Sequence, residues 1–185
     1  MAYIQFLGAA GTVTGSKHLI NFNDDPTGRT GMQVLIDCGL FQGQKEWREK
    51  NWSDPPLAVK EIDAVILTHA HLDHTGWVPR LVKQGYRGPI YATPATMDLC
   101  SVLLADSGHL QEEDAFFHNK KKSSKHEPAL PLYTEDDAFA SLELVRPVAN
   151  EGDGMEAARG IRASFKTAGH ILGSSINVAA FERMA

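Results

Sequence analysis

Cysteine is scarce in this chain of 185 residues, which contains only Cys38 and Cys100. Two cysteines give no disulfide framework and have no zinc-finger spacing, so we expect a protein of the reducing cytoplasm. No apolar run approaches the roughly 20 residues that a membrane-spanning helix needs, so we expect no membrane association. The start, Met-Ala-Tyr-Ile-Gln-Phe, lacks the basic residues and the apolar core of a signal peptide.

An excess of positive charge is also missing, because the formal net charge is −5 at pH 7. This balance argues against a general nucleic-acid coat protein, which needs a basic surface. It leaves room for a nuclease that works through metal ions, because bound cations reverse the local field of an acidic site. Hydrophobic residues make up 43% of the chain, so the length and composition suit one globular domain with a sizeable core.

The densest group of chemically active side chains follows a short apolar run. This β-branched run predicts a buried strand over Ile62–Leu67. Three histidines and an aspartate then fall within six positions: His69, His71, Asp73 and His74. Imidazole nitrogen and carboxylate oxygen are the ligand types that suit a catalytic zinc or a similar divalent metal.

The spacing of these four residues suits two metal ions. His69 and His71 are two apart, so at the end of an extended segment they point the same way. Asp73 and His74 lie where the chain turns toward a helix expected over Gly76–Gln84. Each pair could hold one ion, about 3.5–4 Å apart as in two-metal hydrolytic sites. The alternative is a loop cluster bonded to the backbone, which we would favour for a single histidine but not for four ligands.

Several segments carry a resemblance to a known family. The stretch Thr68–Gly76 resembles the signature motif of the metallo-β-lactamase superfamily, and two others resemble its first and third motifs: Leu35–Gly39, which contains Asp37, and Ala168–Ser174, which contains His170. Gly8–Ser16 and Asp106–Ala115 are similar to the β-CASP branch. That branch comprises RNA-processing nucleases related to the cleavage-and-polyadenylation endonuclease, and the bacterial and archaeal members are the most similar.

The resemblance implies an α/β layered fold of the αββα type, with helices packed on a mixed sheet. It also implies a zinc-dependent hydrolase of the ribonuclease type, which cleaves single-stranded RNA with two zinc ions. Carried over by motif, His69, His71 and His170 would hold one zinc, and Asp73 and His74 would contribute to the other.

Two aspartates would then have catalytic roles. Asp73 could receive a proton during the reaction. Asp37 could orient a ligating histidine and fix its tautomer, although it could also merely cap the turn that follows it.

Other parts of the family pattern have no counterpart here. The pattern places a bridging aspartate after the strand expected over Ser175–Phe181, and a final histidine motif and the β-CASP domain later still. The chain therefore resembles the N-terminal portion of such a nuclease, a single domain over residues 1–185 that is incomplete at its C-terminus. We expect a weakly held second metal, poor RNA binding, impaired activity, and exposed apolar surface on the sheet or at the C-terminus that favours homo-oligomers.

The remaining pattern predicts further strands and turns. A helix or structured loop is expected over Phe41–Trp52, and Gly8–Gly15 is either a loop beside the site or a simple hairpin turn. The other strands are expected over Tyr3–Leu7, Ser16–Phe22, Met32–Ile36, Pro89–Ala92, Leu144–Ala149 and Ile161–Thr167, with a turn over Asn23–Gly31.

A long helix is expected from Pro94 to about Phe117, with Thr93 as its N-cap. Its polar residues Asp106, His109 and Glu113 are interpreted as a solvated face and are not counted as candidate metal ligands. Its helical spacing predicts Leu99, Val102, Leu103 and Leu110 as core residues. Beyond it, Lys120, Lys121, Lys122 and Lys125 form a short basic run, interpreted as a solvated loop with phosphate contact as the alternative. Thr134 and Asp137 resemble a capping box.

Two other functions compete with the ribonuclease. Thioester or lactam hydrolases share the central motif, although Gly8–Ser16 and Asp106–Ala115 argue against them. A catalytically inactive assembly subunit is the non-enzyme alternative, and the intact ligand motifs argue against it.

Overall fold

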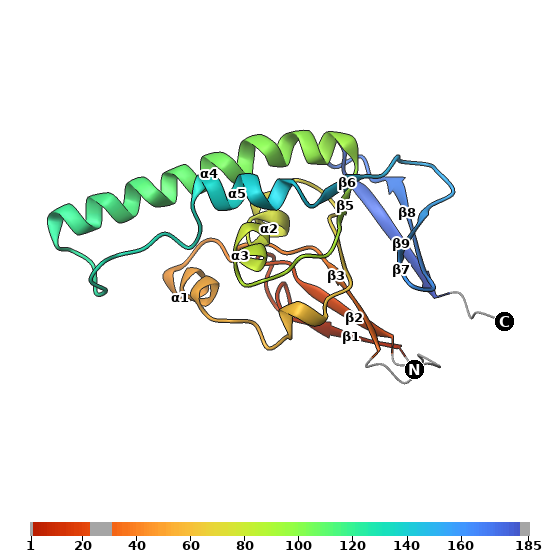
Figure 1. Ribbon diagram of the computed structural model, residues 1–185, viewed down its shortest axis with the longest axis horizontal. Coiled ribbons are helices and arrows are strands. Elements are labelled where there is room, and N and C mark those ends of the chain that lie inside the picture. The colour runs from red at the N-terminus through yellow and green to blue at the C-terminus, as the bar shows by residue number, and fades with distance from the viewer. Residues whose placement is uncertain (1, 23–30, 182–185) are drawn as a thin grey trace.

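The computed structural model describes residues 2–22 and 31–181, in which two sheets and a layer of helices pack together (Figure 1). The first sheet has the order β1-β2-β3-β4-β5-β6, and its strands are Ala2–Phe6, His18–Phe22, Met32–Ile36, Ala64–Ile66, Ile90–Ala92 and Val145–Pro147. Strands β1 to β3 are antiparallel, and β3 to β6 are parallel. The expected mixed sheet is therefore confirmed.

A second, antiparallel sheet packs on one face of the first. It has the order β7-β8-β9, with strands Met155–Ala158, Ile161–Thr167 and Ser175–Phe181. The strands expected at Ile161–Thr167 and Ser175–Phe181 are confirmed. Strand β7 was not predicted, because its sequence Met-Glu-Ala-Ala lacks the β-branched residues that mark a strand.

Helices cover the other face of the first sheet. They are α2 (Leu72–Thr75), α3 (Val78–Lys83), α4 (Pro94–Lys121) and α5 (Glu135–Leu142). The short helix α1 (Lys45–Glu49) has no buried residue, and short 3-10 turns lie at Lys50–Trp52 and Val59–Glu61. The helix expected over Gly76–Gln84 is confirmed as α3, and the short helix α2, which was not predicted, precedes it inside the histidine motif. Asp73 and His74 therefore lie on a helical turn.

Alternation along the central strands explains the layering. Leu35 and Val65 face the helices, whereas Val34 and Ile66 belong to the cluster between the two sheets. All four are completely buried, because both faces of these strands are covered. This is why the strand before the histidine motif is a continuous apolar run.

The long helix α4 corrects part of the predicted core. Thr93 caps it through a bond from the Thr96 N–H, as expected. Val102 and Leu110 were wrong as core residues, because they are 66% and 52% exposed. The buried stripe instead contains Cys100, Leu104 and Gly108, and it faces α5. The two helices approach closely at Gly108, where a Cβ would lie 2.7 Å from the Glu135 nitrogen.

Apolar side chains are exposed on two edge strands, as expected for the sheets. Tyr3, Ile4 and Phe6 project from β1, and Ile176 and Val178 from β9. Self-association through them remains a prediction. The turn expected over Asn23–Gly31 lies almost entirely outside the described residues, and within those residues no helix has the length and apolar character needed to cross a bilayer.

The capping box of α5 predicts a stability loss on acidification. Burial opposes ionisation of Asp137, but hydrogen bonds from Lys83 and from the Thr134 N–H outweigh it and lower its pKa. The stabilisation is therefore present above the ordinary Asp pKa of about 4 and is lost as the pH falls through the folded-state value. We expect Asp137→Ala to cost about 1 kcal/mol at pH 7.

Urea unfolding of the wild type and Asp137→Ala at pH 7 and pH 3 measures this loss. The difference between them should shrink at pH 3. Asp136→Ala, which alters an exposed aspartate on the same helical turn, is the control and should change stability little. An equal loss in both variants would contradict the capping role.

Candidate metal centre

Two loops from different sheets form the candidate site. His69 and His71 lie between β4 and α2, and His170 lies between β8 and β9. The loops are tied together at Ser175, whose N–H donates to the Thr68 carbonyl at 2.9 Å. The fold thereby joins residues about a hundred positions apart at one edge of the sheets.

Three imidazoles converge at this point. His71 Nδ1 lies 3.1 Å from His69 Nε2 and 3.3 Å from His170 Nε2. The ligand nitrogens of all three residues lie within 4.8 Å of one another, with His69 buried and the other two exposed. Three nitrogens around one point with an open side match a catalytic zinc site, which keeps its fourth position for water or substrate.

The electrostatics favour uncharged imidazole at the buried end of the cluster. Burial, followed by repulsion from His74, lowers the pKa of His69 to about 4. Asp37 opposes this shift but does not overcome it. His69 is therefore neutral at pH 7 with a free lone pair, which a metal ligand requires.

Asp37 connects β3 to the histidine loop. It is 3% exposed and has a φ of +57°, a conformation that few residues other than glycine adopt. Its carboxylate accepts the Thr68 N–H at 2.8 Å, lies 2.6 Å from His74 Nδ1, and accepts a longer bond from Ser16 Oγ. These contacts place the carboxylate across the loop after β4 and not on the turn that follows Asp37.

His74 is held between two carboxylates. Besides the contact with Asp37, its Nε2 lies 3.6 Å from Asp73 Oδ2. Burial lowers the pKa of His74, but the hydrogen bond and charge of Asp37 and the charge of Asp73 raise it above its ordinary value. In the described residues the three-ligand cluster contains only His69, His71 and His170, so Asp73 and His74 form a separate pair beside it.

Backbone bonds hold this pair against residues 38–40. The Cys38 N–H donates to the His74 carbonyl at 2.7 Å, and the Leu40 N–H donates to the Leu72 carbonyl at 2.8 Å. Ser16, at the end of the Gly8–Ser16 loop, donates its N–H to the Asp73 carbonyl at 2.8 Å. The loop therefore contacts the site, which is the first of the two interpretations of that stretch.

Gly39 and Lys17 help to hold the site together, and the sequence pattern did not predict this role. A Cβ on Gly39 would lie 1.6 Å from the Asp73 carbonyl oxygen, so only glycine fits between the two segments. The buried Lys17 donates its ammonium to the Gly39 carbonyl and lies over the rings of Phe41 and Trp77. The position of Gly39 two residues after Asp37 was the one available signal, and nothing in the sequence indicates a buried lysine.

A methyl group at Gly39 should push the histidine loop away. We expect Gly39→Ala to destabilise the fold by about 3 kcal/mol, because backbone atoms in both segments must move. Gly43→Ala is the control, since its φ of +89° is unfavourable but a Cβ there meets no atom within 4 Å. It should cost about 1–2 kcal/mol. Urea unfolding of both variants tests this, and equal losses would show that residues 38–40 tolerate displacement.

The amino-acid sequence is similar to proteins of known family. A beta-lactamase superfamily domain matches residues 32–112. Ribonuclease TTHA0252 of Thermus thermophilus is 38% identical over 172 residues, which cover 93% of this chain and 33% of the ribonuclease. Transcription termination factor FttA of Methanocaldococcus jannaschii is 32% identical over 173 residues, which cover 94% of this chain and 24% of the factor.

Solved structures share the fold. A metallo-β-lactamase of Cronobacter sakazakii with a HARLDQ motif superimposes with a TM-score of 0.51 at 18% identity, covering 96% of this chain and 54% of that one. A B3 metallo-β-lactamase with an active-site glutamic acid gives 0.52 at 17% identity, covering 96% and 53%. By contrast, the chain spans a third or less of the length of the ribonuclease and of the termination factor.

These matches agree with the two packed sheets, with the histidine loop after a buried strand, and with the expected ribonuclease branch. The chain therefore has the metallo-β-lactamase fold and matches the beta-lactamase superfamily domain over residues 32–112, and its relatives over most of its length include a ribonuclease and transcription termination factors.

Proposed function

We propose that this chain is a zinc-dependent phosphodiester hydrolase of the ribonuclease type that acts on single-stranded RNA with impaired activity. The observation that carries the proposal is the convergence of His69, His71 and His170 from two separate loops. The names of the relatives, a ribonuclease and a transcription termination factor, support RNA as the substrate class.

The donor atoms fit zinc. Three imidazole nitrogens would hold the first ion, from His69, His71 and His170, and Asp73 and His74 would contribute to a second. A zinc ion bound here supplies a water whose pKa falls toward about 7, and positive charge beside the phosphoryl oxygen. Because the described residues give the second position only two protein ligands, the first site should bind more tightly.

Asp37 and Asp73 have different roles in this proposal. Asp37 lies 2.6 Å from His74 Nδ1, so it would hold the proton on that nitrogen and leave Nε2 free to bind a second ion. Asp73 is partly exposed, with its Oδ2 beside His74 Nε2, so it can take up a proton released during hydrolysis. Asp37 positions a ligand, whereas Asp73 lies where it can contact the reacting atoms.

Two alternatives have weaker support. Hydrolysis of small thioester or lactam substrates shares the metal site, but the β-lactamases above are 17–18% identical and therefore show the fold alone. An inactive assembly subunit would not require three converging ligands, which the structure retains. The activity assay below distinguishes the three functions.

Zinc content tests the proposed ligands. We expect about one zinc per chain in protein purified without added metal, measured by plasma mass spectrometry. His170→Ala should lose most of it, because two ligands remain where three are needed. His109→Ala, which removes an exposed histidine on α4, should keep the wild-type content. Equal zinc in both variants would exclude His170 as a ligand.

Activity separates the function classes. The wild type with zinc should cleave a mixed-sequence single-stranded RNA faster than His170→Ala does, and should leave a small thioester and a β-lactam intact. Cleavage of the thioester or the lactam without cleavage of RNA would support the hydrolase of small substrates. Full zinc occupancy without hydrolysis of any of the three, together with capture of a protein partner that does not depend on metal, would support the assembly subunit.

A further inference from the structure

The far end of α4 carries a concentration of positive charge that the metal centre does not use. Four of the eighteen lysines and arginines fall within positions 120–125, in a chain of net charge −5. They are Lys120, Lys121, Lys122 and Lys125, all exposed. No ion pair joins any of them to another described residue.

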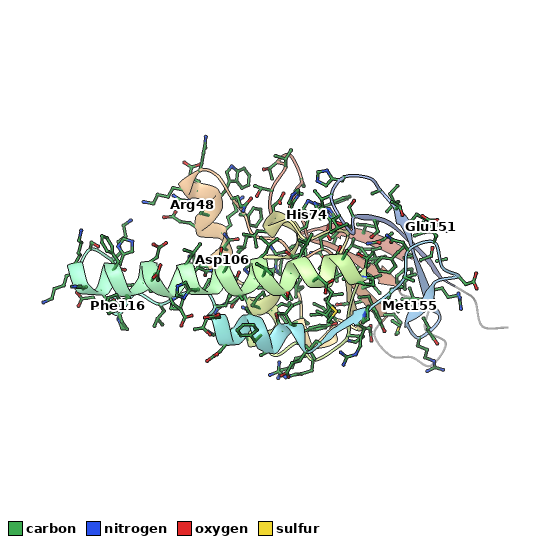
Figure 2. The ribbon with its side chains drawn as sticks, turned by 90° about the horizontal axis from the view of Figure 1, so that it is seen from above. Arg48, His74, Asp106, Phe116, Glu151 and Met155 are labelled. Atoms are coloured by element: carbon green, nitrogen blue, oxygen red, sulfur yellow. The ribbon has the colours of Figure 1, made fainter. Side chains whose placement is uncertain are left out.

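This end of the helix projects away from the site. The N-terminus of α4 lies at the metal centre, because Thr93 and Thr96 both donate to the Gly173 carbonyl in the loop that carries His170. At a rise of about 1.5 Å per residue the helix is roughly 40 Å long. Figure 2 shows Phe116 near the end of α4 that lies away from His74. Lysines there are too distant to take part in the chemistry.

Helix stability explains only part of the cluster. Cations in the last turn interact favourably with the negative end of the helix dipole. That reason applies to Lys120, Lys121 and the C-cap Lys122, but Lys125 lies beyond the helix. Lys125 therefore extends the positive charge past the position where it stabilises the helix.

A groove lies next to the end of the lysine run and has Lys125 in its lining. It measures about 890 Å³ and is bounded by α1, the last turns of α4 and residues 124–132. Its lining includes Lys125, His118, His126 and the half-exposed indole of Trp52. Acidic residues also line it, namely Glu49, Asp114 and Glu127. The phosphates of a polyanion would therefore contact the lysines, while flat apolar groups fit against Trp52.

We infer that the lysines at positions 120–125 and the groove beside them bind single-stranded RNA. The lysines contact phosphates, and the groove accepts unpaired bases, one of which stacks on Trp52. Basic side chains beside an exposed aromatic ring are the combination that holds single strands without sequence preference. The inference rests on the RNA substrate of the proposed function, to which it adds a contact remote from the metal centre.

Charge removal tests the lysine contacts. The variant Lys120→Gln/Lys121→Gln/Lys125→Gln removes three charges from the cluster. The control Lys60→Gln/Arg159→Gln/Lys166→Gln removes three exposed charges from other parts of the surface. Binding of a fluorescent oligoribonucleotide of about 16 nucleotides, within the usual range of single-strand site sizes, is followed by anisotropy in EDTA, so hydrolysis does not contribute.

The lysine variant should bind RNA at least about tenfold more weakly at low salt. Its plot of log affinity against log salt should be shallower by about 2, since each phosphate contact to a single strand contributes roughly 0.7. The control should stay within about twofold of the wild type, and equal thermal unfolding midpoints would exclude a folding defect. Equal losses in the two variants, or no loss in either, would overturn the inference.

Trp52→Ala provides a second, independent test. It should weaken binding while leaving the salt dependence unchanged, because stacking releases no counterions. Unchanged RNA affinity in this variant would show that the groove does not bind RNA. If Trp52→Ala instead dissolves a dimer seen by sedimentation and RNA affinity is unchanged in every variant, the surface binds a second copy and the inference is overturned.

A small phosphodiester separates this inference from the proposed function. Bis(4-nitrophenyl) phosphate cannot extend from the metal centre to the end of α4. Its hydrolysis should be equal in the wild type and the lysine variant. If the wild type fails to hydrolyse it but loses RNA binding in the lysine variant, the proposed chemistry fails and the binding surface stands.

Discussion

The site depends on how the loop after β4 is held against the segment after β3. Backbone bonds from Cys38 and Leu40 to His74 and Leu72 fix one segment on the other. The carboxylate of Asp37 bonds to Thr68 and His74. Because Gly39 has no side chain, its backbone can lie close to the Asp73 carbonyl. A change in this contact would shift both parts of the metal centre, because Asp73 and His74 lie on it and His69 precedes it by a few residues.

The second sheet supplies the third histidine of the candidate site. His170 lies in the loop between β8 and β9, and Ser175 bonds that loop to Thr68. The two sheets are held together by Val34, Ile66 and Phe165, all of which are completely buried. Packing between the sheets therefore determines whether His170 meets His69 and His71. This dependence explains how His170 meets two histidines that lie about a hundred positions earlier in the chain.

The sequence predicted the features that depend on local order. The apolar run before His69, the cap at Thr93 and the capping box at Thr134 each follow from neighbouring residues, and each is present. The features that depend on tertiary approach were missed or wrong. Val102 has helical spacing but lies on the exposed face of α4. Lys17 is buried against the rings of Phe41 and Trp77, which come from distant parts of the chain. The convergence of His170 on His71 was expected only from the family resemblance, since spacing alone cannot relate residues ninety-nine positions apart.

The central claim is that three histidines, and no cysteine, hold a zinc ion in this chain. Cys38 and Cys100 are buried, and burial raises the pKa of each thiol to about 12, so neither supplies a thiolate. X-ray absorption at the zinc edge of the loaded protein tests the claim most directly. We expect nitrogen or oxygen neighbours at about 2.0–2.1 Å with the multiple-scattering pattern of about three imidazoles. A sulfur neighbour at about 2.3 Å, or a shell without imidazole, would contradict it.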